Sequence, residues 1–382
     1  MKYEKGGKLM SINFYAPINN LGYGVHSYNL LKSLDKLGID FALFPPNNIT
    51  DCSDTIIEKW VANQKKFNKN DIGVMIFHEQ FMNRFYGKLR IGFPVFELDL
   101  LSEDIEKLKT LDYILQTSEY FKSYLNSIGF NNVFVIPEGF NPDIYNFDDS
   151  IIQKKEKLLN ERGLIFSHIG KMEERKSTLD IVNVFTQALH NSTNKCTLIL
   201  NVVNPFLSNW FELLSSFIYS IGYIKLQEDE STFSFVKDNL KLIVLKYKLK
   251  NIREIYDSSV FGLYLSKAEG WNLPLIESIA SGLPCVTTCN TGMSDYLKDY
   301  PSEFIVQPGQ SVLANDGVWF RGNRGNWVCP DLGSAKQILR SIANNSSLYL
   351  HKIKDCYNSI KNFTWEMSAQ KFISVMKHIG GL

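Results

Sequence analysis

The sequence of 382 residues contains no long apolar run and does not begin with an apolar leader. Residues 1–8 are polar and charged, which is unlike a signal peptide. A transmembrane helix needs about 18 uninterrupted apolar residues. The nearest candidate, residues 201–226, is interrupted by asparagines, a proline and a glutamate. We therefore expect a cytoplasmic protein without a membrane span, and peripheral contact with the inner face of a membrane stays open.

Cysteine is scarce and scattered, and no recognisable metal motif is present. The six cysteines form no C-x-x-C pair, and no histidine follows them at the spacing of a zinc ligand. This excludes a disulfide scaffold and a structural zinc site, and we expect reduced thiols. A D-x-D motif is also lacking, since the acidic spacings around Asp99 and Asp229 are loose matches. We predict that the protein uses no metal and no cofactor.

Charge of one sign is not in excess. The chain carries 41 Lys+Arg and 40 Asp+Glu, so its net charge is +1. No global field draws it to nucleic acid or to anionic lipid, and we expect no nucleic-acid partner. No predicted strand is followed by a complete G-x-G-x-x-G with a downstream acid, which counts against a dinucleotide-dependent oxidoreductase. The composition, 45% hydrophobic and 21% charged, is that of a globular protein, and the length suggests two domains.

Short apolar segments alternate with segments of helical periodicity along the chain. This alternation is typical of α/β domains with parallel sheets. In the first half we expect strands at residues 10–15, 39–44, 72–77, 113–117 and 133–136, with helices at 25–37, 102–109 and 119–128. In the second half we expect strands at 164–170, 197–203, 242–245, 260–265 and 284–288, with helices at 179–189 and 274–281.

The polar and charged stretch at residues 148–162 suggests a boundary between two Rossmann-like halves. We expect an acceptor-binding domain at 1–155 and a nucleotide-binding domain at 156–360. Parallel sheets bind ligands beyond the carboxyl ends of their strands, so two such domains predict a cleft between those ends.

The most informative segment spans residues 267–284. Gly270 allows a ligand to approach the backbone, and the N–H groups of Gly270, Trp271, Asn272 and Leu273 precede a helix that starts near Pro274. Such a helix start suits a diphosphate. Glu277, expected in the first turn, could accept hydrogen bonds from ribose hydroxyls, and Glu269 lies before the turn. Taken singly, Glu277 could only complement the helix dipole and Glu269 could be a solvated acid.

A basic loop follows the first predicted strand of the second half. Lys171, Arg175 and Lys176 lie within residues 170–177. Cations in one loop can stabilise the negative charge that develops on a departing diphosphate without a metal. On its own such a loop is usually solvated surface. Lysine keeps the charge of arginine but lacks its two-pronged geometry, so Lys176 is a firmer candidate than Lys171.

Two weaker signals lie in the first half. Gly22, Tyr23 and Gly24 form a G-x-G turn, which is often only a tight turn. His78 ends a predicted strand, and a single histidine there is as often structural as functional.

The stretch from Glu269 to Glu277 resembles the E-x7-E signature of retaining GT-B glycosyltransferases, in particular glycosyltransferase family 4. The match includes Trp271 and Asn272 within a Glu-Gly-aromatic-Asn sequence. The resemblance implies that Glu269 holds hydroxyls of the transferred sugar and that Glu277 holds the nucleotide ribose. In the basic loop Lys171 stands where the family usually has arginine, and Ser177 stands where glycine is common.

The same resemblance extends loosely over most of the chain. It implies that Gly22, Tyr23 and Gly24 border the acceptor and the donor phosphates, and that His78 lines the cleft near the transferred sugar. Residues 291–295 resemble a glycine turn that closes the donor pocket. Residues 361–382 resemble a C-terminal helix that crosses back to the first domain.

By this resemblance the protein is a metal-independent, retaining hexosyltransferase. It would use a UDP-sugar, or a GDP-sugar as second choice, in the synthesis of a glycan, glycoconjugate or polysaccharide. Catalytic roles fall on Glu269, His78 and Lys176. Donor binding falls on Lys171, Arg175, Lys176, Gly270, Trp271, Asn272, Leu273 and Glu277. A GT-B epimerase, a phosphorylase and a non-catalytic sugar-nucleotide scaffold remain alternatives, because a fold does not fix a function. The acceptor, the sugar and the oligomeric state are left open.

Overall fold

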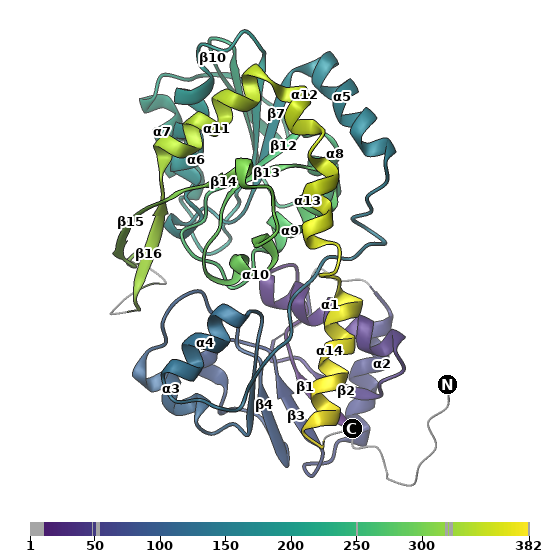
Figure 1. The fold of residues 1–382 in the computed structure, drawn as a ribbon. Coiled ribbons are helices and arrows are strands. Elements are labelled where there is room, and N and C mark those ends of the chain that lie inside the picture. Colours follow the sequence, from purple (N-terminus) through teal and green to yellow (C-terminus); the bar gives the residue numbers. More distant parts are fainter. Residues whose placement is uncertain are drawn as a thin grey trace. The chain divides into compact units, whose positions relative to one another are not determined.

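The computed structural model describes residues 11–47, 49–50, 54–249, 251–317, 320 and 324–380. Cys52 and the first residue of the strand expected at 10–15 lie outside this part of the chain. The chain forms two compact units (Figure 1). Unit 1 consists of Met1–Gly139 and Phe363–Leu382, and unit 2 consists of Phe140–Asn362. Each is described separately below.

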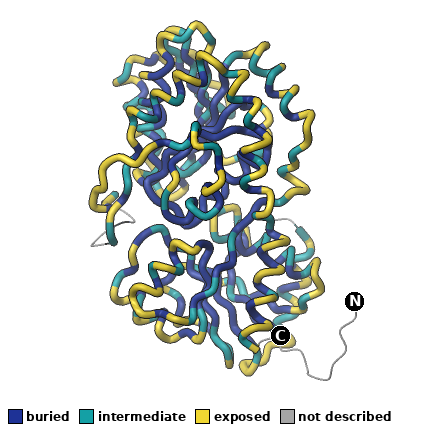
Figure 2. The backbone as a smooth tube through the Cα atoms, viewed as in Figure 1, coloured by how far each residue is buried: buried dark blue, intermediate teal, exposed yellow. Residues whose placement is uncertain are grey.

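Unit 1 contains a six-stranded sheet in the order β2-β1-β3-β4-β5-β6, and every pair in it is parallel. The strands are β1 (Ile12–Tyr15), β2 (Phe41–Phe44), β3 (Ile72–Met75), β4 (Leu89–Gly92), β5 (Tyr113–Gln116) and β6 (Val133–Val135). Their residues are mostly buried, as expected for a parallel sheet covered on both faces (Figure 2). The strand order reverses between β1 and β3, so ligands are expected beyond the carboxyl ends of these strands.

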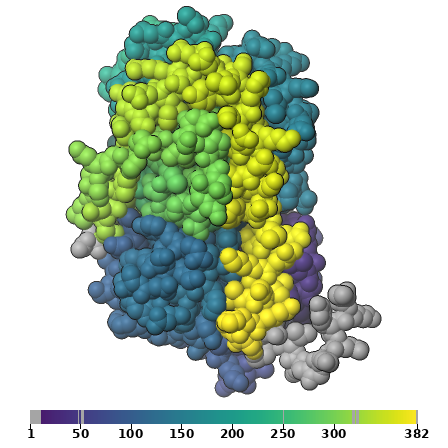
Figure 3. Space-filling view, in the orientation of Figure 1, coloured from purple at the N-terminus to yellow at the C-terminus, as the bar shows by residue number. Residues whose placement is uncertain are grey.

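Helices and short turns connect these strands. They are α1 (Gly22–Lys36), α2 (Ile56–Ala62), η1 (Asn63–Lys66), η2 (Glu79–Phe81), α3 (Ser102–Leu108) and α4 (Glu119–Ser127). The C-terminal helix α14 (Trp365–His378) also belongs to unit 1 and packs along α1. It starts at Trp365 because the Thr364 hydroxyl accepts a hydrogen bond from Met367 N. Figure 3 shows this segment in yellow on the surface of unit 1.

Unit 2 contains an eight-stranded sheet in the order β14-β13-β12-β7-β8-β11-β10-β9. The strands are β7 (Leu164–Ile169), β8 (Cys196–Asn201), β9 (Ile224–Glu228), β10 (Thr232–Lys237), β11 (Leu240–Leu245), β12 (Phe261–Tyr264), β13 (Cys285–Thr288) and β14 (Ile305–Val306). The strands from β14 to β11 are parallel, and the β9–β10 hairpin adds two antiparallel strands at one edge. Two further strands, β15 (Pro308–Leu313) and β16 (Asn326–Pro330), form a separate hairpin.

The helices of unit 2 follow the alternation seen in the sequence. They are α5 (Ser150–Arg162), α6 (Thr178–Leu189), α7 (Trp210–Ser220), α8 (Arg253–Asp257), α9 (Leu273–Ala280), α10 (Ser294–Leu297), α11 (Leu332–Asn344), α12 (Ser346–Leu350) and α13 (Ile353–Ile360). Three short 3₁₀ turns complete the unit: η3 (Glu174–Lys176), η4 (Thr291–Met293) and η5 (Ser302–Phe304). Among the described residues, no helix combines the length and hydropathy needed to span a membrane.

The predicted fold class is confirmed, because both units are Rossmann-like α/β layers built on parallel strands. The sequence prediction missed β4, β14, the two hairpins β9–β10 and β15–β16, the helices α2, α8 and α10–α13, and the helical nature of the stretch at 148–162. That stretch contains α5, whose many charges hid the periodicity of its buried residues. The compact units divide at Gly139 and Phe140, so α5 lies wholly within unit 2.

Candidate functional site in unit 2

The sequence-predicted donor residues of unit 2 gather where the strand order of its sheet reverses. From β7 the chain continues to β8 on one side, whereas β12 lies on the other side. The loop after β7 carries Lys171, Arg175 and Lys176, and the loop after β12 carries Glu269. The two loops are joined by a backbone hydrogen bond of 2.8 Å from Lys267 N to Arg175 O. This reversal point is where parallel sheets bind ligands.

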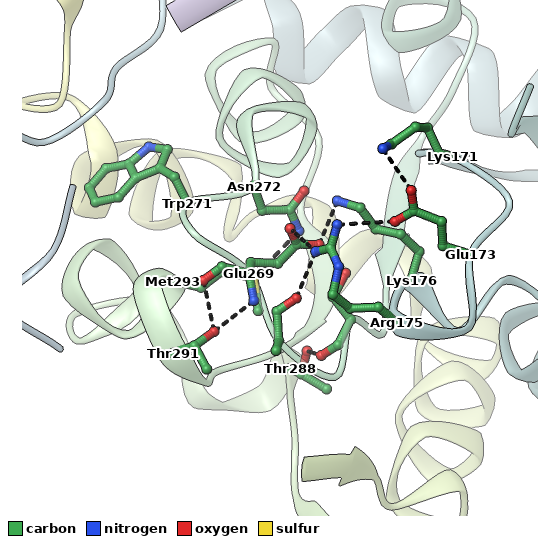
Figure 4. Close-up of polar contacts among 12 residues, drawn as sticks. Lys171, Glu173, Arg175, Lys176, Glu269, Trp271, Asn272, Thr288, Thr291 and Met293 are labelled. Atoms are coloured by element: carbon green, nitrogen blue, oxygen red, sulfur yellow. Dashed lines mark hydrogen bonds and ion pairs between the residues drawn. The ribbon is translucent and has the colours of Figure 1, made fainter. Parts of the chain in front are cut away.

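Five charged side chains form a continuous network in these loops (Figure 4). Arg175 Nη1 lies 2.7 Å from Glu269 Oε2, and Lys176 Nζ lies 2.5 Å from Glu269 Oε1. Arg175 Nη2 lies 3.1 Å from Glu173 Oε2, and Lys171 Nζ lies 2.7 Å from Glu173 Oε1. Cations and carboxylates therefore alternate from Lys171 through Glu173, Arg175 and Glu269 to Lys176.

Most of this network is buried. The side chains of Glu173, Arg175 and Glu269 are at most 5% exposed, whereas that of Lys171 is 37% exposed. Burial alone would raise the pKa of Glu269, but the charges of Arg175 and Lys176 outweigh it and lower that pKa to about 2. Glu269 is therefore a carboxylate at neutral pH, with both oxygens bound by cations.

A buried histidine lies beside this network. Burial lowers the pKa of His168 to about 4, so its imidazole is neutral at physiological pH. The ring Nδ1 lies 3.0 Å from Leu263 O, and Nε2 lies 3.5 Å from Thr178 Oγ1. A neutral imidazole satisfies the first contact by donating from Nδ1, which leaves Nε2 as an acceptor.

The predicted glycine turn at 291–295 packs directly against Glu269. Thr291 Oγ1 accepts a hydrogen bond of 2.7 Å from Glu269 N and donates one of 2.9 Å to Glu269 O. Gly292 N donates a third hydrogen bond, of 3.0 Å, to Glu269 O. A Cβ atom at Gly292 would lie only 2.0 Å from Gly270 O, so this contact requires glycine. The turn fixes the backbone of Glu269 as the cations fix its carboxylate.

Helix α9 begins one residue earlier than expected, at Leu273, with Pro274 as its second residue. Its N-cap, Asn272, has φ 74° and ψ 66°, a left-handed conformation that asparagine tolerates better than most residues. Glu277 therefore lies in the second turn of α9, which corrects the prediction that placed it in the first. It is buried with 7% exposure, and Tyr145 lies near it. Burial, the charge of Glu277 and a hydrogen bond to it raise the pKa of Tyr145.

The side chain of Trp271 differs in character from the other predicted donor residues. It is 1% exposed, its ring lies 4.9 Å from that of Tyr296, and its carbonyl accepts a 2.9 Å hydrogen bond from the Tyr296 hydroxyl. In Figure 4 its indole points away from the charged network. Trp271 thus packs in the core, and its backbone is the part that we expect near a donor. Asn272 is also buried, and its amide nitrogen lies 3.4 Å from Met293 Sδ.

Glu173 and Tyr145 were missed by sequence reasoning. Glu173 lies in the same basic loop as the lysines. The only hint in the sequence was that it is an acidic residue among basic ones, which could have suggested that it pairs with them. Tyr145 lies more than a hundred residues before Glu277, so no local pattern connects the two. Among the described residues, no group of three or more His, Cys, Asp or Glu side chains could hold a metal ion.

The predicted residues of unit 1 lie beyond the carboxyl ends of β1 and β3. Gly22, Tyr23 and Gly24 form the first turn of α1 and not a loop before it, because helix α1 already starts at Gly22. His78 is exposed and precedes η2, and its ring lies 4.5 Å from that of Tyr23. The Tyr23 hydroxyl donates to Val95 O, and burial together with Glu79 and Glu97 raises its pKa. Tyr23 and His78 are thus neighbours within unit 1.

Comparison with known proteins gives one family match and several structural matches. Residues 227–318 match the family model described as glycosyl transferases group 1. No curated protein sequence matches the chain. Among solved structures, sucrose-phosphate synthase from Thermosynechococcus elongatus is 13% identical with a TM-score of 0.64, covering 97% of this chain and 99% of that one.

Two further structures give the same result. HepE from Anabaena, in complex with UDP and glucose, is 12% identical with a TM-score of 0.61, covering 97% of this chain and 100% of that one. The α,α-trehalose-6-phosphate synthase of Burkholderia multivorans is 10% identical with a TM-score of 0.63, covering 98% of this chain and 97% of that one. At these identities the similarity establishes the fold. The chain therefore has the two Rossmann-like α/β domains of GT-B glycosyltransferases, and residues 227–318 carry the group 1 signature.

Proposed function

We propose that this protein is a retaining glycosyltransferase of the family 4 type that moves a hexose from a UDP-sugar to an acceptor hydroxyl in the synthesis of a glycan or glycoconjugate. The observation that carries the proposal is the buried contact of Glu269 with Arg175 and Lys176 at the point where the strand order of unit 2 reverses. The group 1 match covers Glu269 and Glu277 and supports it. The bound UDP of the Anabaena structure favours UDP over GDP as the carrier.

The residues of unit 2 suit the donor. We assign the diphosphate to Lys171, Lys176 and the N–H groups at the start of α9, because cations and a helix N-terminus favour phosphate. Glu277 would accept hydrogen bonds from the ribose, and Glu269 would hold hydroxyls of the sugar. Since the lysines supply the positive charge that a diphosphate needs, we propose that transfer requires no metal.

In the transfer step the bond between the anomeric carbon and the diphosphate oxygen breaks, and the acceptor oxygen bonds to that carbon. The acceptor proton passes to the departing diphosphate oxygen on the same face, which retains the configuration. Lys171 and Lys176 stabilise the charge on the leaving group. We assign the acceptor to unit 1, where Gly22, Tyr23, Gly24 and His78 lie beyond the carboxyl ends of its strands.

Cysteine usage supports a cytoplasmic setting for this reaction. The five cysteines in the described part of the chain, Cys196, Cys285, Cys289, Cys329 and Cys356, are all free thiols. Free thiols without disulfides are typical of a reducing compartment, where nucleotide sugars would serve as donors.

Slow hydrolysis of the donor in the absence of an acceptor tests this proposal. Wild-type protein should release UDP and free sugar from a UDP-hexose, unaffected by EDTA, and the sugar first released should have the configuration of the donor. Glu269→Gln should lower the rate by about 100-fold, as loss of a group acting on the transition state typically does. Glu230→Gln, which changes an exposed acid after β9, is the control.

Other outcomes would identify the alternatives. Conversion of the donor to a different nucleotide sugar indicates an epimerase, and turnover that requires inorganic phosphate indicates a phosphorylase. Equal rates for Glu269→Gln and wild type would contradict the assigned role of Glu269.

A further inference from the structure

Arg175 makes more hydrogen bonds to other protein groups than its two lysine neighbours do. Its Nη1 donates to Glu269 Oε2 at 2.7 Å and to Ala268 O at 2.8 Å, and its Nη2 donates to Glu173 Oε2 at 3.1 Å. The side chain is 5% exposed. The planar guanidinium therefore spans two carboxylates through two separate nitrogens held in a fixed plane, whereas a lysine has a single, flexibly placed ammonium nitrogen.

The two lysines bind the other oxygen of each carboxylate. Lys176 contacts Glu269 Oε1 and Lys171 contacts Glu173 Oε1. Lysine is a flexible point charge, and the Lys171 side chain is the most exposed of the five. A diphosphate that recruits both lysines would take one cation from each carboxylate. A buried carboxylate left without a cation is costly, so something must hold both glutamates while the lysines turn.

We propose that Arg175 is a positioning residue that holds the Glu173 and Glu269 carboxylates together, so that Lys171 and Lys176 can turn to the donor diphosphate. Of the three cations in the network, Arg175 is the one that contacts both carboxylates, so it stays bound to both when the lysines leave. The turning of the lysines to the diphosphate rests on the proposed function, whereas the holding of the carboxylates by Arg175 does not. This replaces the expectation that Arg175 contacts the donor itself.

Other groups that face Glu269 do not supply this charge. His168, on β7, is neutral at physiological pH. Thr291 contributes neutral hydrogen bonds to the backbone of Glu269. Lys267 follows β12, and its ammonium pairs with Glu174, whose side chain is half exposed. The cations on Glu269 are therefore Arg175 and Lys176.

The first test needs no ligand. Melting temperatures of wild type, Arg175→Gln and the control Lys237→Gln, whose ammonium donates to a backbone carbonyl, Ile221 O, are compared at pH 7.5 and pH 4.5. Removing Arg175 raises the pKa of Glu269, because burial then has less positive charge to oppose it. At pH 7.5 Arg175→Gln should melt about 5 °C or more below wild type, as expected for one missing partner of a buried ion pair. At pH 4.5 the gap in melting temperature should narrow, since Glu269 of the variant, whose pKa is raised, takes up a proton more readily than Glu269 of wild type. Lys237→Gln should show no such pH dependence. A gap of equal size at both pH values would overturn the proposal.

The second test measures the Kd for UDP in wild type, Arg175→Gln, Glu173→Gln and the double variant. If Arg175 positions the glutamates, Arg175→Gln weakens UDP binding because the carboxylates retain the lysines. Adding Glu173→Gln to that variant removes the carboxylate that retains Lys171, so it should tighten UDP binding at least about tenfold. The same substitution in wild type should tighten UDP binding much less. If Glu173→Gln changes the Kd for UDP by the same factor in wild type and in Arg175→Gln, Arg175 acts as a direct phosphate ligand and the proposal is overturned. If wild type binds no nucleotide, the proposed function fails, and the melting experiment still decides the role of Arg175.

Discussion

Replacing Lys176 with methionine removes a buried cation and keeps a side chain of similar length. Lys176 Nζ lies 2.5 Å from Glu269 Oε1, and the two side chains are 10% and 4% exposed. The fall in the pKa of Glu269 from 4.5 to about 2 corresponds to about 3 kcal/mol of stabilisation at neutral pH, shared between Arg175 and Lys176. Burial lowers the pKa of Lys176 itself, so the desolvation of its ammonium offsets part of this gain. We therefore expect Lys176→Met to lower the free energy of unfolding of unit 2 by about 1–2 kcal/mol, or about 2–8 °C in melting temperature.

The pH dependence of this stabilisation has a defined sign. Because the folded pKa of Glu269 lies below the unfolded value, its contribution to stability is full above pH 4.5 and is lost as the pH falls toward 2.

The assay is thermal unfolding at pH 7.5 of Lys176→Met, Glu269→Gln and the double variant. Since the two residues interact directly, the double variant should cost about 1–2 kcal/mol less than the sum of the single changes. Lys225→Met, in an exposed ion pair with Glu228, should change stability by less than about 1 kcal/mol. Strictly additive costs for Lys176 and Glu269 would refute the reasoning.

Two further substitutions test contacts next to the residues predicted to bind the donor or the acceptor. A Cβ at Gly24 would lie 2.4 Å from Asn19 N, whereas a Cβ at Gly22 meets nothing within 4 Å; Gly24→Ala should therefore lower the melting temperature of unit 1, and Gly22→Ala should not. Equal melting of the two variants would contradict the close approach of Asn19. Tyr145→Phe removes the hydroxyl that bonds Glu277 and keeps the ring, so it should weaken UDP binding about fivefold, the effect of one hydrogen bond, as measured by calorimetry. An unchanged Kd would show that this hydroxyl does not position Glu277 for the ribose.

The general architecture could be predicted from the sequence because parallel α/β units leave strong local signals. Buried strands read as short apolar runs, and the stretch around β7 is one example that the structure confirms. Helix α9 was also predicted within one residue at each end, since a proline begins it and Gly282 follows it. Strand β4 escaped notice because it is short and partly exposed, so its sequence lacks a clear apolar run.

The sequence named four of the five residues of the charged network as candidates, but not the contacts between them. The Glu269 motif and the basic loop are each local patterns, and the order of the strands brings them together. The pairing of Arg175 with two glutamates could not be predicted, because it depends on side-chain directions across two loops. The link from Tyr145 to Glu277 also arises only from the fold, since the segment after Phe140 packs back onto α8, where Arg253 Nη1 donates to Ile144 O at 2.9 Å.

The central claim is that unit 2 binds a nucleoside-diphosphate sugar through Lys171 and Lys176 of its charged network. The most direct measurement is calorimetric binding of UDP-, GDP- and ADP-sugars to wild type and to Lys176→Ala, with and without Mg²⁺. The account predicts that a UDP-sugar binds wild type without Mg²⁺ and that Lys176→Ala weakens this binding at least about tenfold, as expected for loss of a charged hydrogen-bond partner. Absence of binding for every nucleotide sugar, with or without Mg²⁺, would contradict it.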